Sequence, residues 1–172
     1  MSKFNEQLKI IEEEIFEGAS SEEVKKRQEK GREIELKDKL DEIKSRSTVN
    51  ADGSLNVEGD VNLFHLGLKE ILLKFNKVNG HFYCSWNQLT SLEGCPKKVG
   101  RNFNCAHNQL TSLKGCPKQV DGNFYCAINQ LTSLEGCPEK VNGNFYCYGN
   151  KVIFTEEDVK KYCNVKGRIY VR

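Results

Sequence analysis

Apolar residues recur at regular intervals through the middle of the chain. Four segments of equal length align without a gap: VNGHFYCSWNQLTSLEGCPKK from Val78, VGRNFNCAHNQLTSLKGCPKQ from Val99, VDGNFYCAINQLTSLEGCPEK from Val120 and VNGNFYCYGNKVIFTEEDVKK from Val141, which define a 21-residue period. A divergent copy from Val57 precedes them, and the last copy loses the pattern after Val152. Such regular self-similarity is typical of repeat proteins, whose end copies differ because they face water.

Each copy contains the pattern of a short strand followed by a turn. In the third aligned copy, Phe124 and Cys126 alternate with Tyr125, which has the period of two expected for a strand, and the sequence GCP then marks a turn. One unit of this size cannot bury its own apolar side, whereas stacked units share a core. We therefore predict an α+β repeat solenoid of about five rungs over residues 48–154, built on one continuous parallel sheet.

The repeated motif resembles a known family. The pattern F-x-C-x-x-N-x-L-x-x-L is similar to the leucine-rich-repeat signature, and the short unit with LTSL before a proline is similar to its bacterial subtype. The near-identical NQLTSLEGCP units also resemble small repeat proteins of bacteriophage genomes. This resemblance implies a solenoid fold and an asparagine ladder formed by Asn87, Asn108, Asn129 and Asn150. It also implies a phage-encoded protein that acts in the cytoplasm of a bacterial host.

Seven of the eight cysteines belong to the repeat. One column holds Cys84, Cys105, Cys126 and Cys147, and the other holds Cys95, Cys116 and Cys137. The alternative to buried thiols is a metal or redox ladder. However, no C-x-x-C pair occurs, and the long steps between successive cysteines do not match a zinc site. We expect small buried hydrophobes without a metal or a cofactor.

The outward strand positions are the candidate functional surface. Three columns are expected to be exposed: Asn62, Tyr83, Asn104, Tyr125 and Tyr146; Phe64, Ser85, Ala106, Ala127 and Tyr148; and His65, Trp86, His107 and Ile128. Clustered exposed aromatic residues are typical of interfaces, although they would also serve to support the sheet or to pack under the amino-terminal helices. The predicted protein-binding face consists of Phe64, His65, Tyr83, Trp86, Asn104, His107, Tyr125, Ile128, Tyr146 and Tyr148.

No catalytic set is found among these residues. His65 and His107 share a column but lie two rungs apart, roughly 10 Å, which is too far for two ligands of one metal ion. The third histidine, His81, lies outside that column. With no paired carboxylates, phosphate-binding glycine loop or nucleophile motif, we expect a protein that is not an enzyme.

Composition narrows the class of partner. The net charge is +2, well short of the basic excess of most nucleic-acid-binding proteins, and Arg101 is the nearest cation to the aromatic columns. No apolar run approaches the roughly 20 residues that span a bilayer. The beginning of the chain, MSKFNEQLKIIEEE, becomes acidic too soon for a secretory signal. These features favour a cytoplasmic protein with no membrane contact.

The two ends of the chain differ from the repeats. Residues 1–47 are highly charged, and the 4-3-4 spacing of Phe4, Leu8, Ile11 and Ile15 predicts a first amphipathic helix. Ser20 and Glu23 form a candidate capping box for a second helix over about 21–46. These helices would cap the first rung, form a homodimer or contact the partner, and all three interpretations are open.

At the other end, residues 155–172 predict a cap for the last rung. Thr155 is a candidate N-cap for a helix over EEDVKKYC, and a strand over 165–171 follows it.

The favoured function is a protein-protein interaction module, which the phage resemblance narrows to an inhibitor of a bacterial host or anti-phage defence protein. The alternative is a structural or assembly protein of a phage particle that oligomerises through the amino-terminal helices. Nucleic-acid binding by aromatic stacking ranks last, because it needs a basic groove.

Overall fold

A computed structural model describes residues 20–172, and the chain divides into two compact units, Met1–Ser45 and Arg46–Arg172. In the first unit, helix α2 spans Ser21–Ser45. Its capping box is formed by Ser20 and Glu23: the backbone N–H of Glu23 donates to Ser20 Oγ (3.3 Å), and that of Ser20 donates to the Glu23 carboxylate (2.9 Å). The predicted second helix is confirmed.

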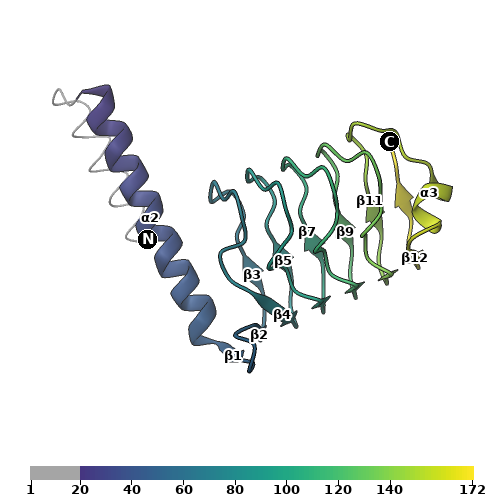
Figure 1. The fold of residues 1–172 in the computed structure, drawn as a ribbon, viewed down its shortest axis with the longest axis horizontal. Coiled ribbons are helices and arrows are strands. Elements are labelled where there is room, and N and C mark those ends of the chain that lie inside the picture. The colour runs from purple at the N-terminus through teal and green to yellow at the C-terminus, as the bar shows by residue number, and fades with distance from the viewer. Residues whose placement is uncertain (1–19) are drawn as a thin grey trace. The chain divides into compact units, whose positions relative to one another are not determined.

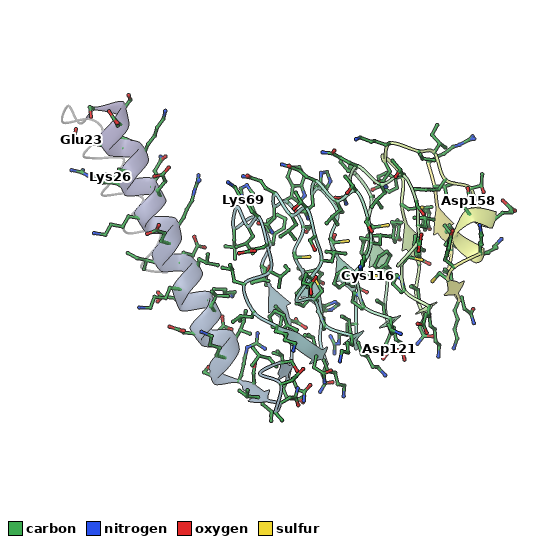
Figure 2. The ribbon with its side chains drawn as sticks, viewed as in Figure 1. Glu23, Lys26, Lys69, Cys116, Asp121 and Asp158 are labelled. Atoms are coloured by element: carbon green, nitrogen blue, oxygen red, sulfur yellow. The ribbon has the colours of Figure 1, made fainter. Side chains whose placement is uncertain are left out.

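Helix α2 is polar over most of its surface. Ile43 is its buried residue, whereas Ile34 is 44% exposed. The charged side chains Glu23 and Lys26 project from its amino-terminal half (Figure 2). The predicted first helix, based on the spacing of Phe4 to Ile15, lies outside the described residues.

The second unit is a β-solenoid, in which short parallel strands stack into successive turns (Figure 1). One sheet, sheet A, has the order β1-β2-β4-β6-β8-β10-β12, and the other, sheet B, has the order β13-β11-β9-β7-β5-β3. The strands of sheet A are β1 (Ser47–Val49), β2 (Leu55–Val57), β4 (Phe75–Val78), β6 (Lys98–Val99), β8 (Gln119–Val120), β10 (Lys140–Val141) and β12 (Asn164–Val165). Those of sheet B are β3 (Val61–Asn62), β5 (Phe82–Tyr83), β7 (Phe103–Asn104), β9 (Phe124–Tyr125), β11 (Phe145–Tyr146) and β13 (Ile169–Tyr170).

The repeat solenoid is confirmed, but the expectation of one continuous sheet is wrong. Each turn contributes one strand to each of the two sheets, and a glycine corner separates the two strands. A side chain at Gly122 would place its Cβ 2.7 Å from the carbonyl carbon of Arg101 in the previous turn. Successive turns therefore lie in close contact at this corner, where the backbone N–H of Gly122 donates to the carbonyl of Arg101 (3.0 Å).

The register between turns follows the period of the sequence. Phe82 pairs with Phe103, and Phe103 with Phe124, in sheet B, while the valines pair in sheet A. The buried phenylalanine rings stack inside the solenoid, with 5.5 Å between the centroids of Phe82 and Phe103 and 5.7 Å between those of Phe103 and Phe124. Because each side chain repeats beside its own copy, one well-packed turn specifies the packing of the next.

An antiparallel hairpin closes the first end of sheet A and was not predicted. Strand β1 pairs with β2, and the connection between them turns at Gly53, whose φ is +76°. Asp52 accepts hydrogen bonds from the backbone N–H and the hydroxyl of Ser54. The Asp-Gly pair is a recognised hairpin signal, so the sequence did indicate this element.

The other end of the solenoid has the predicted helix and an additional turn. Helix α3 spans Glu156–Lys160, and Thr155 and Asp158 form its capping box. The expected single strand over 165–171 is instead two strands, β12 and β13, which extend both sheets. The segment from Val165, V-x-G-x-I-Y, repeats the V-x-G-x-F-Y segment from Val141 at a longer spacing than that of the other copies. It therefore forms a sixth turn.

No helix within residues 20–172 combines the length and the apolar composition that crossing a membrane requires.

Candidate binding face

The outer side of sheet B carries a column of tyrosines. Tyr125 stacks on Tyr146, and Tyr146 on Tyr170, with 4.5 Å between ring centroids and interplanar angles of 8° and 2°. The rings are half-buried. The column includes Tyr170, which the sequence interpretation missed because this residue lies out of step with the regular period. At the other end of the column, Asn104 separates Tyr83 from this stack.

Asparagines hold these rings in place. The Tyr125 hydroxyl accepts a hydrogen bond from Asn123 Nδ2 (2.9 Å), and the Tyr146 hydroxyl accepts one from Asn144 Nδ2 (3.1 Å). Burial raises the pKa of the Tyr125 hydroxyl above its usual value. The stacked and hydrogen-bonded rings form an ordered surface, with little side-chain freedom left to lose on binding.

The neighbouring column has an unusual backbone. His65, Trp86, His107 and Ile128 have φ of 55°, 56°, 54° and 53°, in the left-handed region that disfavours side chains. The fifth turn has Gly149 at the same position, with φ of +67°. A β-branched residue such as Ile128 is especially unfavourable there. The column thus retains large side chains at positions where glycine or asparagine would be more stable.

Two contacts order the first half of this face. Trp86 stacks on His107 with 4.0 Å between ring centroids and an interplanar angle of 15°, and Trp86 is 52% exposed. Phe64, which is 50% exposed, contacts the His65 ring at 5.9 Å in a tilted arrangement. These rings form an exposed aromatic group on the first three turns.

The remaining expected column, which begins at Phe64 and ends at Tyr148, is exposed only at its ends. Phe64 and Tyr148 are exposed, but the prediction was wrong for three small residues, which are buried: Ser85, Ala106 and Ala127. The strands contain only two residues, so the alternation of inward and outward side chains ends before this position. In the third turn, for example, Asn104 Oδ1 accepts a hydrogen bond from the backbone N–H of Ala106 (3.0 Å) and bends the chain.

The predicted face therefore separates into two groups joined through Asn104. The group on the first turns contains Phe64, His65, Tyr83, Trp86 and His107. The group on the later turns contains Tyr125, Ile128, Tyr146 and Tyr148, to which the structure adds Tyr170. Sheet B and the turn that follows each of its strands position both groups.

The asparagine ladder has the position that the resemblance implied. Asn108 Oδ1 accepts from the backbone N–H of Leu89 in the previous turn (3.0 Å), and its Nδ2 donates to the carbonyls of Cys84 (3.0 Å) and Cys105 (3.1 Å). The other three asparagines make equivalent contacts. The ladder is structural, because it satisfies buried backbone groups between turns.

A second polar ladder was not predicted, and it accounts for His81. The backbone N–H of His81 donates to Asp60 Oδ1 (2.8 Å), and His81 Nδ1 accepts from the backbone N–H of Asn102 (3.1 Å). In the later turns Asn102, Asn123 and Asn144 accept in the same way. The His81 ring also stacks on Tyr83, with centroids 5.1 Å apart. His81 thus joins adjacent turns.

All eight cysteines are free thiols, and Cys116, in the middle of the array (Figure 2), is the one that is partly exposed. Burial raises the pKa of Cys126 and raises that of Cys147 to about 12. These two thiols therefore stay neutral at pH 7, and the buried thiols fill the interior as small groups. Among residues 20–172, no group of three or more His, Cys, Asp or Glu residues is placed to hold a metal ion.

Two parallel ladders, each of which gains one strand with every copy of the repeat, place the chain in the class of β-solenoids. Members of such fold classes differ in function, so the function must be argued from the surface. No family model, curated protein or solved structure matches the chain.

Proposed function

We propose that the protein is a non-enzymatic protein-protein interaction module that binds its partner through the aromatic face of sheet B. The observation that carries this proposal is the left-handed column. Residues in disfavoured backbone regions cost on the order of 1–3 kcal/mol each and tend to persist at functional sites. His65, Trp86, His107 and Ile128 hold this conformation with large side chains.

The chemistry of the face suits another protein. Its ten predicted residues and Tyr170 contain no Asp, Glu, Lys or Arg. Tyrosine and tryptophan bury much apolar area and still present a hydrogen-bonding group, which is why they anchor many interfaces. Nucleic-acid binding ranks lower, because the face has no lysine or arginine to contact phosphates.

The resemblance to bacteriophage repeat proteins extends the proposal to a biological role. In this role the protein acts in the host cytoplasm, where it occludes a bacterial host enzyme or an anti-phage defence protein. This extension rests on the resemblance, whereas the binding face rests on the residues described above. The two parts therefore need separate tests.

A pull-down from bacterial lysate tests the binding face, and identification of the retained protein tests the biological role. The immobilised chain should retain a partner that the double variant Trp86→Ala/Tyr125→Ala loses. A matched control, Val49→Ala/Tyr162→Ala, changes two exposed residues outside the face and should recover the partner as well as wild type. Unchanged recovery by the first variant would refute the face. Identification of the retained protein by mass spectrometry then tests the inhibitor role.

The alternative is a structural or assembly protein that forms a homodimer through its amino-terminal helices. The 44% exposure of Ile34 on α2 favours it, because an exposed apolar residue on a long polar helix is a candidate contact. Static light scattering distinguishes the two functions. A dimer that Ile34→Glu converts to a monomer supports assembly, whereas a wild-type monomer at all concentrations removes this alternative.

A further inference from the structure

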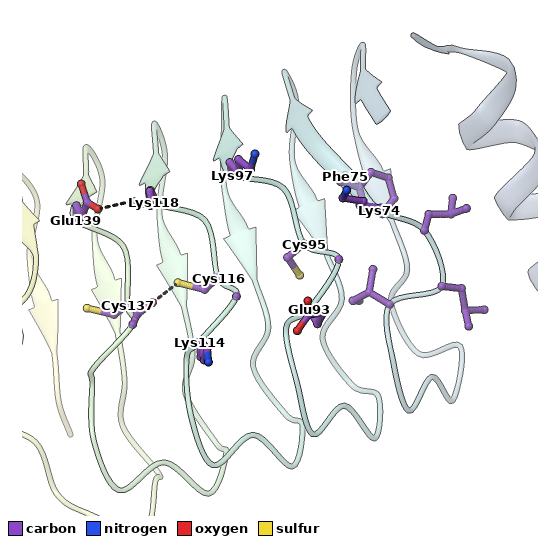
Figure 3. Close-up of a pocket in the computed structure, with 16 residues that line it drawn as sticks. Lys74, Phe75, Glu93, Cys95, Lys97, Lys114, Cys116, Lys118, Cys137 and Glu139 are labelled. Carbon is purple, nitrogen blue, oxygen red and sulfur yellow. Dashed lines mark hydrogen bonds and ion pairs between the residues drawn. The ribbon is translucent and has the colours of Figure 1, made fainter. Parts of the chain in front are cut away.

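A groove of about 740 Å³ crosses four turns of the solenoid on the side of the Gly-Cys-Pro turns (Figure 3). Its lining comes from the segments 71–75, 93–97, 114–118 and 136–139. None of these segments belongs to a strand of sheet B, so the groove is separate from the aromatic face. An inference about the groove is therefore independent of the proposed binding through the aromatic face.

Glycines and thiols form the hollow. Gly115 has φ of +89°, and a Cβ there would lie 2.9 Å from the carbonyl carbon of Leu92, so the turns approach each other closely. The next residue, Cys116, donates from its Sγ to the carbonyl of Gly136 (3.0 Å). Burial raises the pKa of the Cys116 thiol, which keeps this part of the groove uncharged at neutral pH. The base of the groove is therefore apolar.

The charges around the groove are unevenly distributed. At its first end, Lys74 pairs with Asp52 (2.9 Å), and at its last end Lys118 pairs with Glu139 (3.2 Å; Figure 3). In the middle, Lys97 and Lys114 are exposed and belong to no ion pair among residues 20–172. Because the middle cations are not neutralised, an anionic group is most favoured there.

Beside the Lys74–Asp52 ion pair, the first end of the groove also carries apolar side chains. Leu72 is 46% exposed, and the buried residues Ile71 and Phe75 adjoin it in the lining. Lysines and an exposed leucine thus follow one another along the groove. A ligand that complements it needs an apolar group at one end and negative charge about one or two turns further along.

We propose that this groove binds an extended acidic peptide segment of a partner protein, with an apolar side chain at Leu72 and carboxylates at Lys97 and Lys114. Four turns at a spacing of about 4.8 Å cover roughly 14 Å, which corresponds to about four residues of extended chain. The two glutamates of the lining, Glu93 and Glu139, would repel the continuous phosphates of a nucleic acid. A short peptide avoids them by placing its carboxylates at the two lysines.

Fluorescence anisotropy with labelled peptides tests this proposal. The probe is a fluorescein-labelled peptide of one leucine followed by four glutamates, and its counterpart has four glutamines instead. The acidic peptide should bind the full chain at low salt and at least tenfold more tightly than its counterpart. Binding should weaken as the salt concentration rises. Absence of binding, or equal binding of the two peptides, would overturn the proposal.

Variants locate the site. Lys97→Glu/Lys114→Glu should weaken binding at least tenfold, and Leu72→Ser should weaken it severalfold. The control Lys69→Glu/Lys151→Glu makes the same charge change at exposed lysines outside the groove and should stay within twofold of wild type. Equal losses in both double variants would mean a diffuse charge effect and refute the groove. If circular dichroism shows that the reversal variant is unfolded, Lys97→Gln/Lys114→Gln replaces it.

Two further measurements test whether the groove is distinct from the aromatic face and whether it binds nucleic acid rather than a peptide. The aromatic-face variant Trp86→Ala/Tyr125→Ala should bind the acidic peptide normally, since the sites are distinct, and a parallel loss would contradict this. An unlabelled oligothymidine that displaces the peptide at lower concentration than unlabelled peptide would assign the groove to nucleic acid instead.

Discussion

Trp86 stacks on His107 because the two residues occupy equivalent left-handed positions in neighbouring turns. Their φ values are 56° and 54°, and their ring centroids lie 4.0 Å apart. A shared backbone conformation directs both rings outward in parallel. Successive turns lie about 4.8 Å apart, which is close enough for stacking. The same conformation costs free energy in every turn that lacks glycine, and this cost is measurable.

We expect Ile128→Asn to stabilise the protein by about 0.5–1 kcal/mol, because asparagine tolerates the left-handed region and a β-branched residue does not. Ile128 has φ of 53° and is 40% exposed, so the variant loses little packing. Thermal unfolding should show a higher Tm. The same variant should bind the partner more weakly. A lower Tm would show that the backbone at this position is not strained.

The asparagine ladder predicts a large cost for Asn108→Ala. The substitution leaves the N–H of Leu89 and the carbonyls of Cys84 and Cys105 without their side-chain partner in a buried region. We expect a loss of about 2–5 kcal/mol in urea denaturation. The exposed neighbour Gln109→Ala serves as control and should change stability by less than about 0.5 kcal/mol. Equal losses of stability in Asn108→Ala and Gln109→Ala would contradict the structural role of the asparagine ladder.

His81 acts as a hydrogen-bond acceptor between turns, so an asparagine should replace it. The Nδ1 atom of histidine and the Oδ1 atom of asparagine lie at the same distance along the side chain, and Asn102 uses its Oδ1 in this way. We expect His81→Asn to stay within about 0.5 kcal/mol of wild type and His81→Leu to cost about 1–3 kcal/mol. Chemical denaturation of both variants measures these changes. Equal stability of His81→Asn and His81→Leu would contradict the role of His81 as an acceptor.

Acidification should weaken the hairpin that closes sheet A. The hydroxyl of Ser54, and then the ammonium of Lys74, hold the pKa of Asp52 well below its usual range. A lowered pKa in the folded state means that the stabilisation is present above about pH 4 and is lost as the pH falls further. The Tm difference between wild type and Asp52→Asn should therefore shrink from pH 7 to pH 3. A constant difference would argue against this linkage.

Thiol reactivity should distinguish Cys116 from the other cysteines. It is the one partly exposed thiol, and its raised pKa makes its alkylation slow. Mass spectrometry of the native protein with iodoacetamide should show a single modification that Cys116→Ser abolishes. The remaining thiols should react only in denaturant. Simultaneous modification of several cysteines in the native state would mean that the turns open.

The sequence predicted the repeat solenoid, the interior columns and two helices, one with a capping box at Ser20 and one with an N-cap at Thr155. These features depend on periodicity and on local backbone chemistry, both of which are visible in a single chain. The division into two sheets was missed, because the pattern shows which residues face inward and not where the backbone turns a corner. The glycine before each phenylalanine strand was the available signal.

The candidate face was predicted only in outline. Nothing in the identity of Trp86 or Ile128 indicates a left-handed backbone, and Gly149 in the same column is the one hint. The burial of Ala106 follows from the bend after a two-residue strand, which strand periodicity does not anticipate. Tyr170 could have been found from V-x-G-x-I-Y, had the last copy of the repeat been allowed a longer spacing than the others.

That irregular spacing has a consequence for how such a chain changes over generations. Val165 pairs with Val141 although α3 lengthens the intervening loop, and Tyr170 still stacks on Tyr146. The hydrogen-bond ladders thus accept extra residues wherever the loop bulges outward, and each turn contacts mainly its neighbours. Duplication or deletion of one whole copy, or a small insertion in its outer loop, preserves every ladder. The array is free to vary in length while its construction stays the same.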